Sequence, residues 1–159
     1  GYNRTIYSNG CSEFYGQIVT TGPIMKRGYD IDIVNNIITL SSNMRLLSNS
    51  LSSLANLNNI IVKCTTSGRS LYLPMISTIQ SVYTGLVETN SWAMKLTIVA
   101  HRSNTVDFNI LPDTSCTIYD QNGNTSSSLP LSKGDSYTLL LYHEAGSSTY
   151  EAQIINRMN

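Results

Sequence analysis

Short apolar or alternating segments recur about every ten residues along this chain, and turn-forming residues separate them. Alternation of apolar and polar side chains is typical of β-strands with one buried face. We expect strands at residues 4–7, 12–20, 29–34, 37–40, 59–65, 70–73, 81–87, 92–101, 105–111, 116–119, 136–143 and 149–155. Many short strands at this spacing predict an all-β fold, either a sandwich or a barrel.

One segment departs from the strand pattern. Residues 42–57 place Met44, Leu47, Leu51 and Leu54 at helix-like spacings, and a serine at 41 or 42 is available as an N-cap. Their serine and asparagine content makes them weak helix formers. We therefore expect at most one short helix near residues 42–57, or else a long ordered loop there.

Several turns can be located from residue types. Asn35-Asn36 is expected to join two strands as a tight hairpin, and Pro74-Met75-Ile76 to mark a loop or a sheet edge. Residues 119–124 and 129–135 each combine polar residues with glycine and are predicted turns, with residues 126–128 as a polar bridge between them.

Composition narrows the classes of function. The chain has 159 residues, which fits one domain, with 13% charged residues and a formal net charge of zero. A neutral surface has no electrostatic footprint for nucleic acid or for an anionic membrane, so we expect neither partner. Ten tyrosines, with abundant serine, threonine and asparagine, favour binding through hydrogen bonds and flat amphipathic rings.

The three cysteines, Cys11, Cys64 and Cys116, are widely spaced and form no Cys-x-x-Cys pair, which indicates neither a disulfide framework nor a zinc site. We expect buried thiols and synthesis in a reducing cytoplasm, with one disulfide plus a spare thiol as the alternative. No apolar run reaches membrane-spanning length and no signal pattern opens the sequence. Because Gly1 stands where an initiator methionine would, we expect a segment excised from a longer protein.

Two groups of residues resemble a known family. Tyr7-Ser8-Asn9-Gly10, followed by a strand that carries Gly16, resembles the start of the receptor-binding tip domain of bacteriophage tail fibres. Later in the chain, the positions of a terminal β-sandwich module of tail-fibre and related phage structural proteins are matched by Phe108, Gly123, Pro130, Leu131, Gly134, Tyr137 and Tyr150. Residues 25–90 lie outside the resemblance, and Tyr119 stands where such modules often carry tryptophan.

The resemblance implies a single head domain over residues 1–159, with an all-β, antiparallel β-sandwich fold of jelly-roll-like or knob type. It further implies a homotrimer at the tail or fibre tip of a virion, made in the host cytoplasm. Its function would be attachment to a host cell-surface glycan or protein. The alternatives are a bacterial adhesin or carbohydrate-binding module, a purely structural virion protein, and a glycan-degrading enzyme.

Catalytic patterns are weak. His101 and His143 are the two histidines, both at predicted strand ends, and no Gly-x-Ser-x-Gly elbow of a catalytic triad accompanies them. Because each stands beside a charged residue, Arg102 or Glu144, we interpret both as surface residues. The sequence indicates no cofactor, and we expect a binding protein rather than an enzyme. Asp120, Asn122 and Asn124 alternate as calcium ligands can, but without the glutamate of an EF-hand they favour a plain β-turn.

Glycan binding is the function that these residue types favour, since sugars are recognised by stacking on aromatic rings and by hydrogen bonds from polar side chains. Binding residues gather on loops that a rigid scaffold holds. The predicted ligand-binding residues are Tyr72, Tyr83, Asp113, Tyr119, Asp120 and Asn122. Tyr119 is the sharpest probe, with a core position as its alternative, whereas Trp92 is expected in the core.

Overall fold

The computed structural model describes residues 37–47, 59–82 and 86–159, all within the second of two compact units, Ile33–Asn159. The predicted strands before residue 37, the Asn35-Asn36 hairpin, Cys11, Gly16 and Tyr83 lie outside the described residues. The expectation of a single domain over residues 1–159 stays a prediction.

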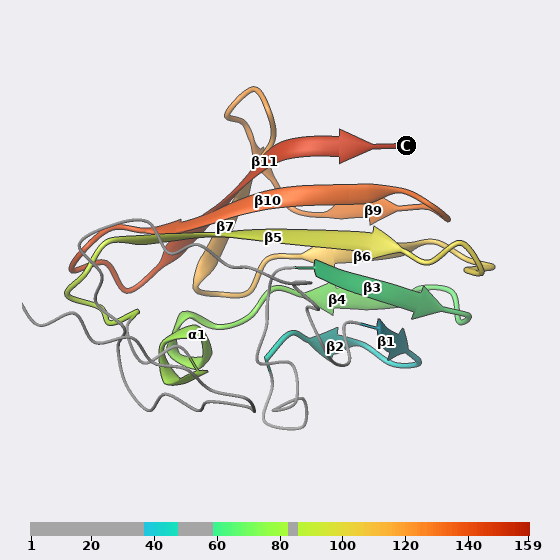
Figure 1. Ribbon diagram of the computed structural model, residues 1–159, viewed down its shortest axis with the longest axis horizontal. Helices are drawn as coiled ribbons and strands as arrows, with labels where there is room; N and C mark the ends of the chain where they lie inside the picture. Colours follow the sequence, from blue (N-terminus) through green and yellow to red (C-terminus); the bar gives the residue numbers. More distant parts are fainter. Residues whose placement is uncertain (1–36, 48–58, 83–85) are drawn as a thin grey trace, which may run out of the picture. The chain divides into compact units, whose positions relative to one another are not determined.

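Strands make up 50% of the described residues and form two sheets (Figure 1). The seven-stranded sheet contains, in spatial order, β1 (Ile37–Leu40), β3 (Asn59–Cys64), β5 (Trp92–Ala100), β10 (Ser136–His143), β11 (Tyr150–Met158), β7 (Cys116–Tyr119) and β8 (Thr125–Ser126). The four-stranded sheet contains β2 (Met44–Arg45), β4 (Ser70–Tyr72), β6 (Phe108–Leu111) and β9 (Leu129–Leu131). The all-β expectation is confirmed at this level.

The first six strands alternate between the two sheets and stack in parallel. β1, β3 and β5 are parallel neighbours in the larger sheet, and β2, β4 and β6 are parallel neighbours in the smaller one. Each pair, β1 with β2, β3 with β4 and β5 with β6, therefore forms one coil of a short solenoid-like stack. The prediction of an antiparallel arrangement is wrong for this half, because alternation reveals which face of a strand is buried but not the direction of its neighbour.

The second half of the described chain is largely antiparallel. β9 pairs antiparallel with β6, and β10 pairs antiparallel with β5, so the chain runs the opposite way through this last layer. β11 then adds antiparallel to β10, β7 adds parallel to β11, and β8 adds antiparallel to β7. The larger sheet thus extends three strands beyond the layer at which the smaller sheet ends.

The apolar faces of both sheets contribute to one core. Along β10 every second residue, from Tyr137 to His143, is buried, and β3 shows the same alternation. Trp92 is buried, as predicted, and Cys64 and Cys116 are buried free thiols, as predicted for these two residues. Burial raises the pKa of the Cys116 thiol to about 12, because a thiolate would lose its solvation there.

The helix is not where the sequence predicts it. The described residues contain one helix, α1 (Ile76–Val82), whereas residues 44–45 form strand β2 and residues 48–58 lie outside the described part. α1 follows Pro74, and the Ser115 hydroxyl accepts the Ile76 N–H at 3.0 Å. This distant cap and the burial of Ile79 stabilise a segment that was expected to be a loop up to residue 76 and a strand from residue 81.

His143 also differs from its expectation as a surface residue. It is 2% exposed, and its ring stacks on Trp92 with 5.4 Å between the ring centroids. The ring nitrogens lie 2.9 Å from the Thr149 carbonyl oxygen and 3.2 Å from that of Glu88. The histidine joins two loops through buried contacts, because β10 carries its inward alternation to its final residue. His101, by contrast, is half-buried.

Candidate binding groove

A concavity among the described residues lies beside β9, where the smaller sheet ends and the larger one continues through β11, β7 and β8. We call it the β9 groove. Its volume is about 330 Å³, and it is lined by Asp120, Gln121, Asn122, Ser126, Ser128, Leu129, Pro130, Tyr137, Ile154 and Arg157. Polar side chains predominate, so the groove suits a hydrophilic ligand.

The inner wall of the β9 groove comes from β10 and β11. Tyr137 and Ile154 are buried, whereas Arg157 is exposed and holds its guanidinium over the Tyr137 ring, 5.3 Å from the centroid. Tyr137 and Arg157 are direct partners across the antiparallel pair. A cation held over an aromatic face is attracted by the negative potential of the ring, so Tyr137 restrains the arginine.

A β-bulge places this arginine. The β10–β11 register shifts at Thr138/Leu139, so Leu139 faces Ile154 while Thr138 faces Asn156, and Ile155 is the additional residue. In a regular strand Asn156 would share a face with Ile154. The bulge instead brings Arg157 to the face that carries Ile154. Arg157 therefore lines the groove because of the bulge.

The rim of the groove is the turn that follows β7. Asp120 Oδ1 accepts the backbone N–H groups of Asn122 and Asn124, each at 2.8 Å, and Oδ2 accepts the Asn124 side-chain amide at 3.2 Å. These bonds, with that from the Asn124 backbone first, hold the pKa of Asp120 below its usual value. Gly123 adopts φ +83°, which favours glycine. The predicted turn is confirmed, and its carboxylate is charged at neutral pH.

β9 and the segment before it also line the groove. Ser126 donates its hydroxyl to the Ser128 carbonyl at 2.9 Å. Pro130 is exposed at the centre of β9, the outermost strand of the smaller sheet. Proline has no backbone N–H and blocks the addition of a further strand at such an edge. The second predicted turn is shorter than expected, because residues 129–131 form β9 and the turn itself spans Ser132 to Asp135.

Two of the predicted ligand residues, Asp120 and Asn122, come together in the β9 groove. Tyr119 is half-buried on β7 and does not line it; Tyr119 and the buried Ile118 alternate along the strand, so the ring lies on the other face of the sheet. Tyr83 lies outside the described residues. The groove unites loop residues with strand residues that were not among the predicted ligands.

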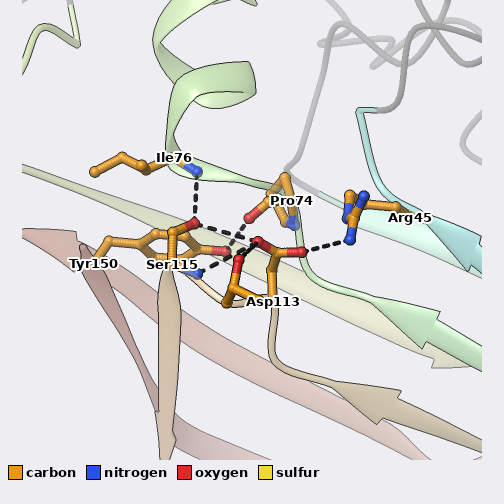
Figure 2. Close-up of polar contacts among 7 residues, drawn as sticks. Arg45, Pro74, Ile76, Asp113, Ser115 and Tyr150 are labelled. Carbon is orange, nitrogen blue, oxygen red and sulfur yellow. Dashed lines mark hydrogen bonds and ion pairs between the residues drawn. The ribbon is translucent and has the colours of Figure 1, made fainter. Parts of the chain in front are cut away.

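Tyr72 and Asp113 belong to a separate cluster, and Figure 2 shows the polar contacts around Asp113. Asp113 is 5% exposed, and its Oδ2 lies 2.7 Å from an Arg45 guanidinium nitrogen. Arg45 also lies over the Tyr72 ring, 6.0 Å from its centroid. The Asp113 carboxylate accepts hydrogen bonds from the Thr114 hydroxyl at 3.1 Å and from the Ser115 N–H at 3.4 Å. Asp113, a predicted ligand-binding residue, is therefore engaged by internal partners.

The same cluster joins three parts of the fold. Ser115 receives the first N–H of α1, and the buried Tyr150 donates its hydroxyl to the Pro74 carbonyl at 2.7 Å (Figure 2). Burial is the main cause of the high pKa of the Tyr150 hydroxyl. These contacts tie β2, the segment before α1 and β11 together, so we assign the cluster a structural role.

Among the groove residues that sequence reasoning missed are Ser126, Ser128, Tyr137 and Arg157. The sequence does carry a signal for the serines, since residues 126–128 interrupt the strand pattern beside a predicted turn. The pairing of Tyr137 with Arg157 has none, because strict alternation directs Arg157 away from the face of Ile154. Only the register shift of the bulge brings the two residues together.

The described residues contain neither a metal-binding cluster nor a membrane-spanning helix. Within residues 37–47, 59–82 and 86–159, no group of three or more histidine, cysteine, aspartate or glutamate side chains is arranged to hold a metal ion. The single described helix is too short to cross a membrane.

Comparisons with known proteins add no relative. No family model matches the chain, and no match was found among curated proteins or among solved structures.

Proposed function

We propose that this chain binds a carbohydrate through the β9 groove and serves as the attachment module of a viral, phage-type fibre. The observation that carries the proposal is an open groove whose rim presents Asp120, Asn122 and Ser128 and whose wall presents Arg157. Carboxylate, amide, hydroxyl and guanidinium groups on a preformed concave surface are the groups that hydrogen-bond sugar hydroxyls.

The lining favours binding over hydrolysis. Canonical glycoside hydrolysis uses two carboxyl groups that flank the scissile bond. Asp120 is the single carboxylate among the described residues that line the groove, and its hydrogen bonds favour the ionised form, whereas a general acid needs a raised pKa. The groove therefore has the composition of a recognition site.

The viral setting rests on the resemblance of the opening turn and of the positions between Phe108 and Tyr150. Within this proposal the two sheets are the layers of a knob-like or jelly-roll-like sandwich, the protein is a homotrimer on the virion, and the host glycan is its receptor. A monomeric bacterial adhesin or carbohydrate-binding module would use the same groove, and its solution mass would distinguish it.

A glycan array probed with the purified chain tests the carbohydrate function. We expect binding to a defined set of glycans, and Asn122→Ala should weaken it by about 0.5–1.5 kcal/mol, because one hydrogen-bonding side chain is lost from the rim. Asn90→Ala is the matched control, since Asn90 is exposed and does not line the groove. Glycan binding that Asn122→Ala leaves unchanged would move the site elsewhere.

A further inference from the structure

We infer that the β9 groove selects sugars that carry a carboxylate, such as uronic or sialic acids, and that Arg157 binds this group. The inference rests on the proposed carbohydrate function and adds a ligand class to it. It follows from the contacts that the two charged side chains lining the groove, Asp120 and Arg157, already make within the protein.

Asp120 and Arg157 differ in how far their charges are already engaged. Three N–H groups of its own turn donate to the Asp120 carboxylate, which satisfies much of its hydrogen-bonding capacity. Arg157 is exposed, and no described carboxylate lies within ion-pair distance of it. The arginine is therefore the charge in the groove that remains available to a ligand.

The position of the guanidinium suits a carboxylate. Its contact with the Tyr137 ring limits the orientations of the side chain, which lowers the entropy lost on binding. A guanidinium donates two parallel N–H bonds to a carboxylate, and this geometry is specific for planar anions. The buried Tyr137 ring lies beneath the arginine, so sugar stacking on this tyrosine is not required.

The backbone of β11 adds donors of the same kind. β7 pairs with β11 only as far as Gln153, so the edge of β11 beyond this residue has no partner strand among the described residues. Free N–H groups at a sheet edge can bind anions. Ile154 and Arg157 lie on this stretch and both line the groove.

Two further features favour a small acidic sugar over an extended acidic peptide. Pro130 removes a backbone donor from the β9 rim and blocks strand addition there. Asp120 Oδ2 can accept hydrogen bonds from hydroxyls, and the Asn122 side-chain amide can donate to them; a sugar supplies hydroxyls at several adjacent carbons. A ligand with one carboxylate and several hydroxyls matches both walls of the groove.

The test uses glycan pairs that differ in the charge of a carboxyl group: sialylated glycans and uronic-acid oligomers, each with its methyl ester. The wild-type chain should bind carboxylate-bearing members, and methyl esterification of the bound glycans should abolish binding. Arg157→Gln should reduce affinity for the best acidic glycan by at least about tenfold, since a charge-assisted bidentate bond is lost. Arg157→Lys keeps the positive charge but loses the bidentate guanidinium geometry, so its affinity should lie between those of the wild type and Arg157→Gln.

Arg102→Gln is the matched control, because it removes the same charge from an exposed position outside the groove. The melting temperature of Arg157→Gln should equal that of the wild type, which separates lost recognition from lost folding. Equal binding to neutral and acidic members would overturn this inference and leave the carbohydrate function standing. An array without any bound glycan, or with capture of acidic peptides alone, would overturn both.

Discussion

Asp113 and Asp120 make the same local backbone hydrogen bond, but Asp113 is buried and Asp120 lines the β9 groove. Each accepts a backbone N–H from the residue two positions later, at 3.4 Å for Asp113 and 2.8 Å for Asp120. The sequence predicts the turn at Asp120 from its residue types. It does not reveal that the Asp113 side chain becomes 1% exposed against Arg45, since that contact joins segments nearly seventy residues apart.

Asp113→Asn should destabilise the fold. The change keeps the shape of the side chain but removes the charge that the Arg45 guanidinium needs, so we expect a loss of about 1–3 kcal/mol of unfolding free energy. Chemical denaturation measures it. Asp107→Asn, on an exposed side chain, is the control and should change stability by less than about 0.5 kcal/mol. Equal effects of the two substitutions would remove the structural role that we assign to the cluster.

Asp120 should titrate below its usual value of 3.8 in the folded protein. Backbone and side-chain N–H groups of Asn124 favour the ionised form, so the pKa is lowered on folding. The associated stabilisation is therefore present above the unfolded pKa, near 3.8, and is lost as the pH falls through the lower folded value. Carboxyl chemical shifts recorded by NMR against pH give the midpoint directly. In Asn124→Ala it should move upward, and a midpoint of 3.8 or above in the wild type would contradict the turn geometry.

At the scale of elements, the alternation of apolar and polar residues predicts where several strands lie, but it does not predict which strands pair with one another. The expected strands at 37–40 and 136–143 coincide with β1 and β10, and 116–119 coincides with β7. Parallel stacking of β1, β3 and β5 was not foreseen, because pairing direction depends on contacts between distant segments. The helix was misplaced for a related reason: α1 is stabilised by Ser115, which the local sequence does not indicate.

Asparagine side chains connect successive coils of the stack, and one of them is buried. Asn104 lies in the connection after β5, where its Oδ1 accepts the Cys64 N–H at 2.9 Å and its Nδ2 donates to the Val62 carbonyl at 3.1 Å. Asn43 makes a similar bond to the Ser70 N–H at 3.1 Å, but it is exposed. Water can replace the exposed bond of Asn43 but not the buried bonds of Asn104. Asn104 should therefore contribute more to the free energy of unfolding than Asn43.

Asn104→Ala should cost about 1–3 kcal/mol of unfolding free energy, since the buried Cys64 N–H loses its acceptor. Asn43→Ala is the matched control and should cost less than about 1 kcal/mol. Urea denaturation of both variants, with the same slope against denaturant, measures the difference. If Asn43→Ala lowers the free energy of unfolding as much as Asn104→Ala does, the buried hydrogen bond stabilises the fold no more than the exposed one.

At the scale of the whole molecule, the candidate site arises from unequal sheets. The larger sheet continues through β11, β7 and β8 after the smaller one ends at β9, and the β9 groove lies beside that end. Composition favours a neutral binding protein, and the residue types at 119–124 predict the Asp120 turn. The difference in width between the two sheets comes from strand order alone. The sequence therefore predicts the rim of the groove at Asp120 and Asn122. It does not predict the wall that Tyr137 and Arg157 form, nor the depth of the groove.

The homotrimer is the prediction that belongs to this scale. A formal net charge of zero and 13% charged residues leave a surface on which copies of the chain meet little repulsion. The outer face of the larger sheet carries Ile37, which is 52% exposed, together with the half-buried Ile61, Val99 and Leu140 on β3, β5 and β10. Apolar side chains at the centre of a contact are typical of stable interfaces between copies.

The resemblance to fibre-tip domains implies three copies, so sedimentation equilibrium at micromolar concentration should give three times the chain mass of 17.5 kDa. Leu140→Lys should shift the trimer towards monomer if this face forms the contact, because it buries an unpaired charge there. Thr117→Lys is the control, since Thr117 is exposed on β7 near the opposite edge of the sheet. Trimers unaffected by Leu140→Lys would place the interface elsewhere on the molecule. A wild-type monomer would instead favour the carbohydrate-binding module over the fibre tip, because weak single-site sugar binding gains useful avidity only from several linked copies.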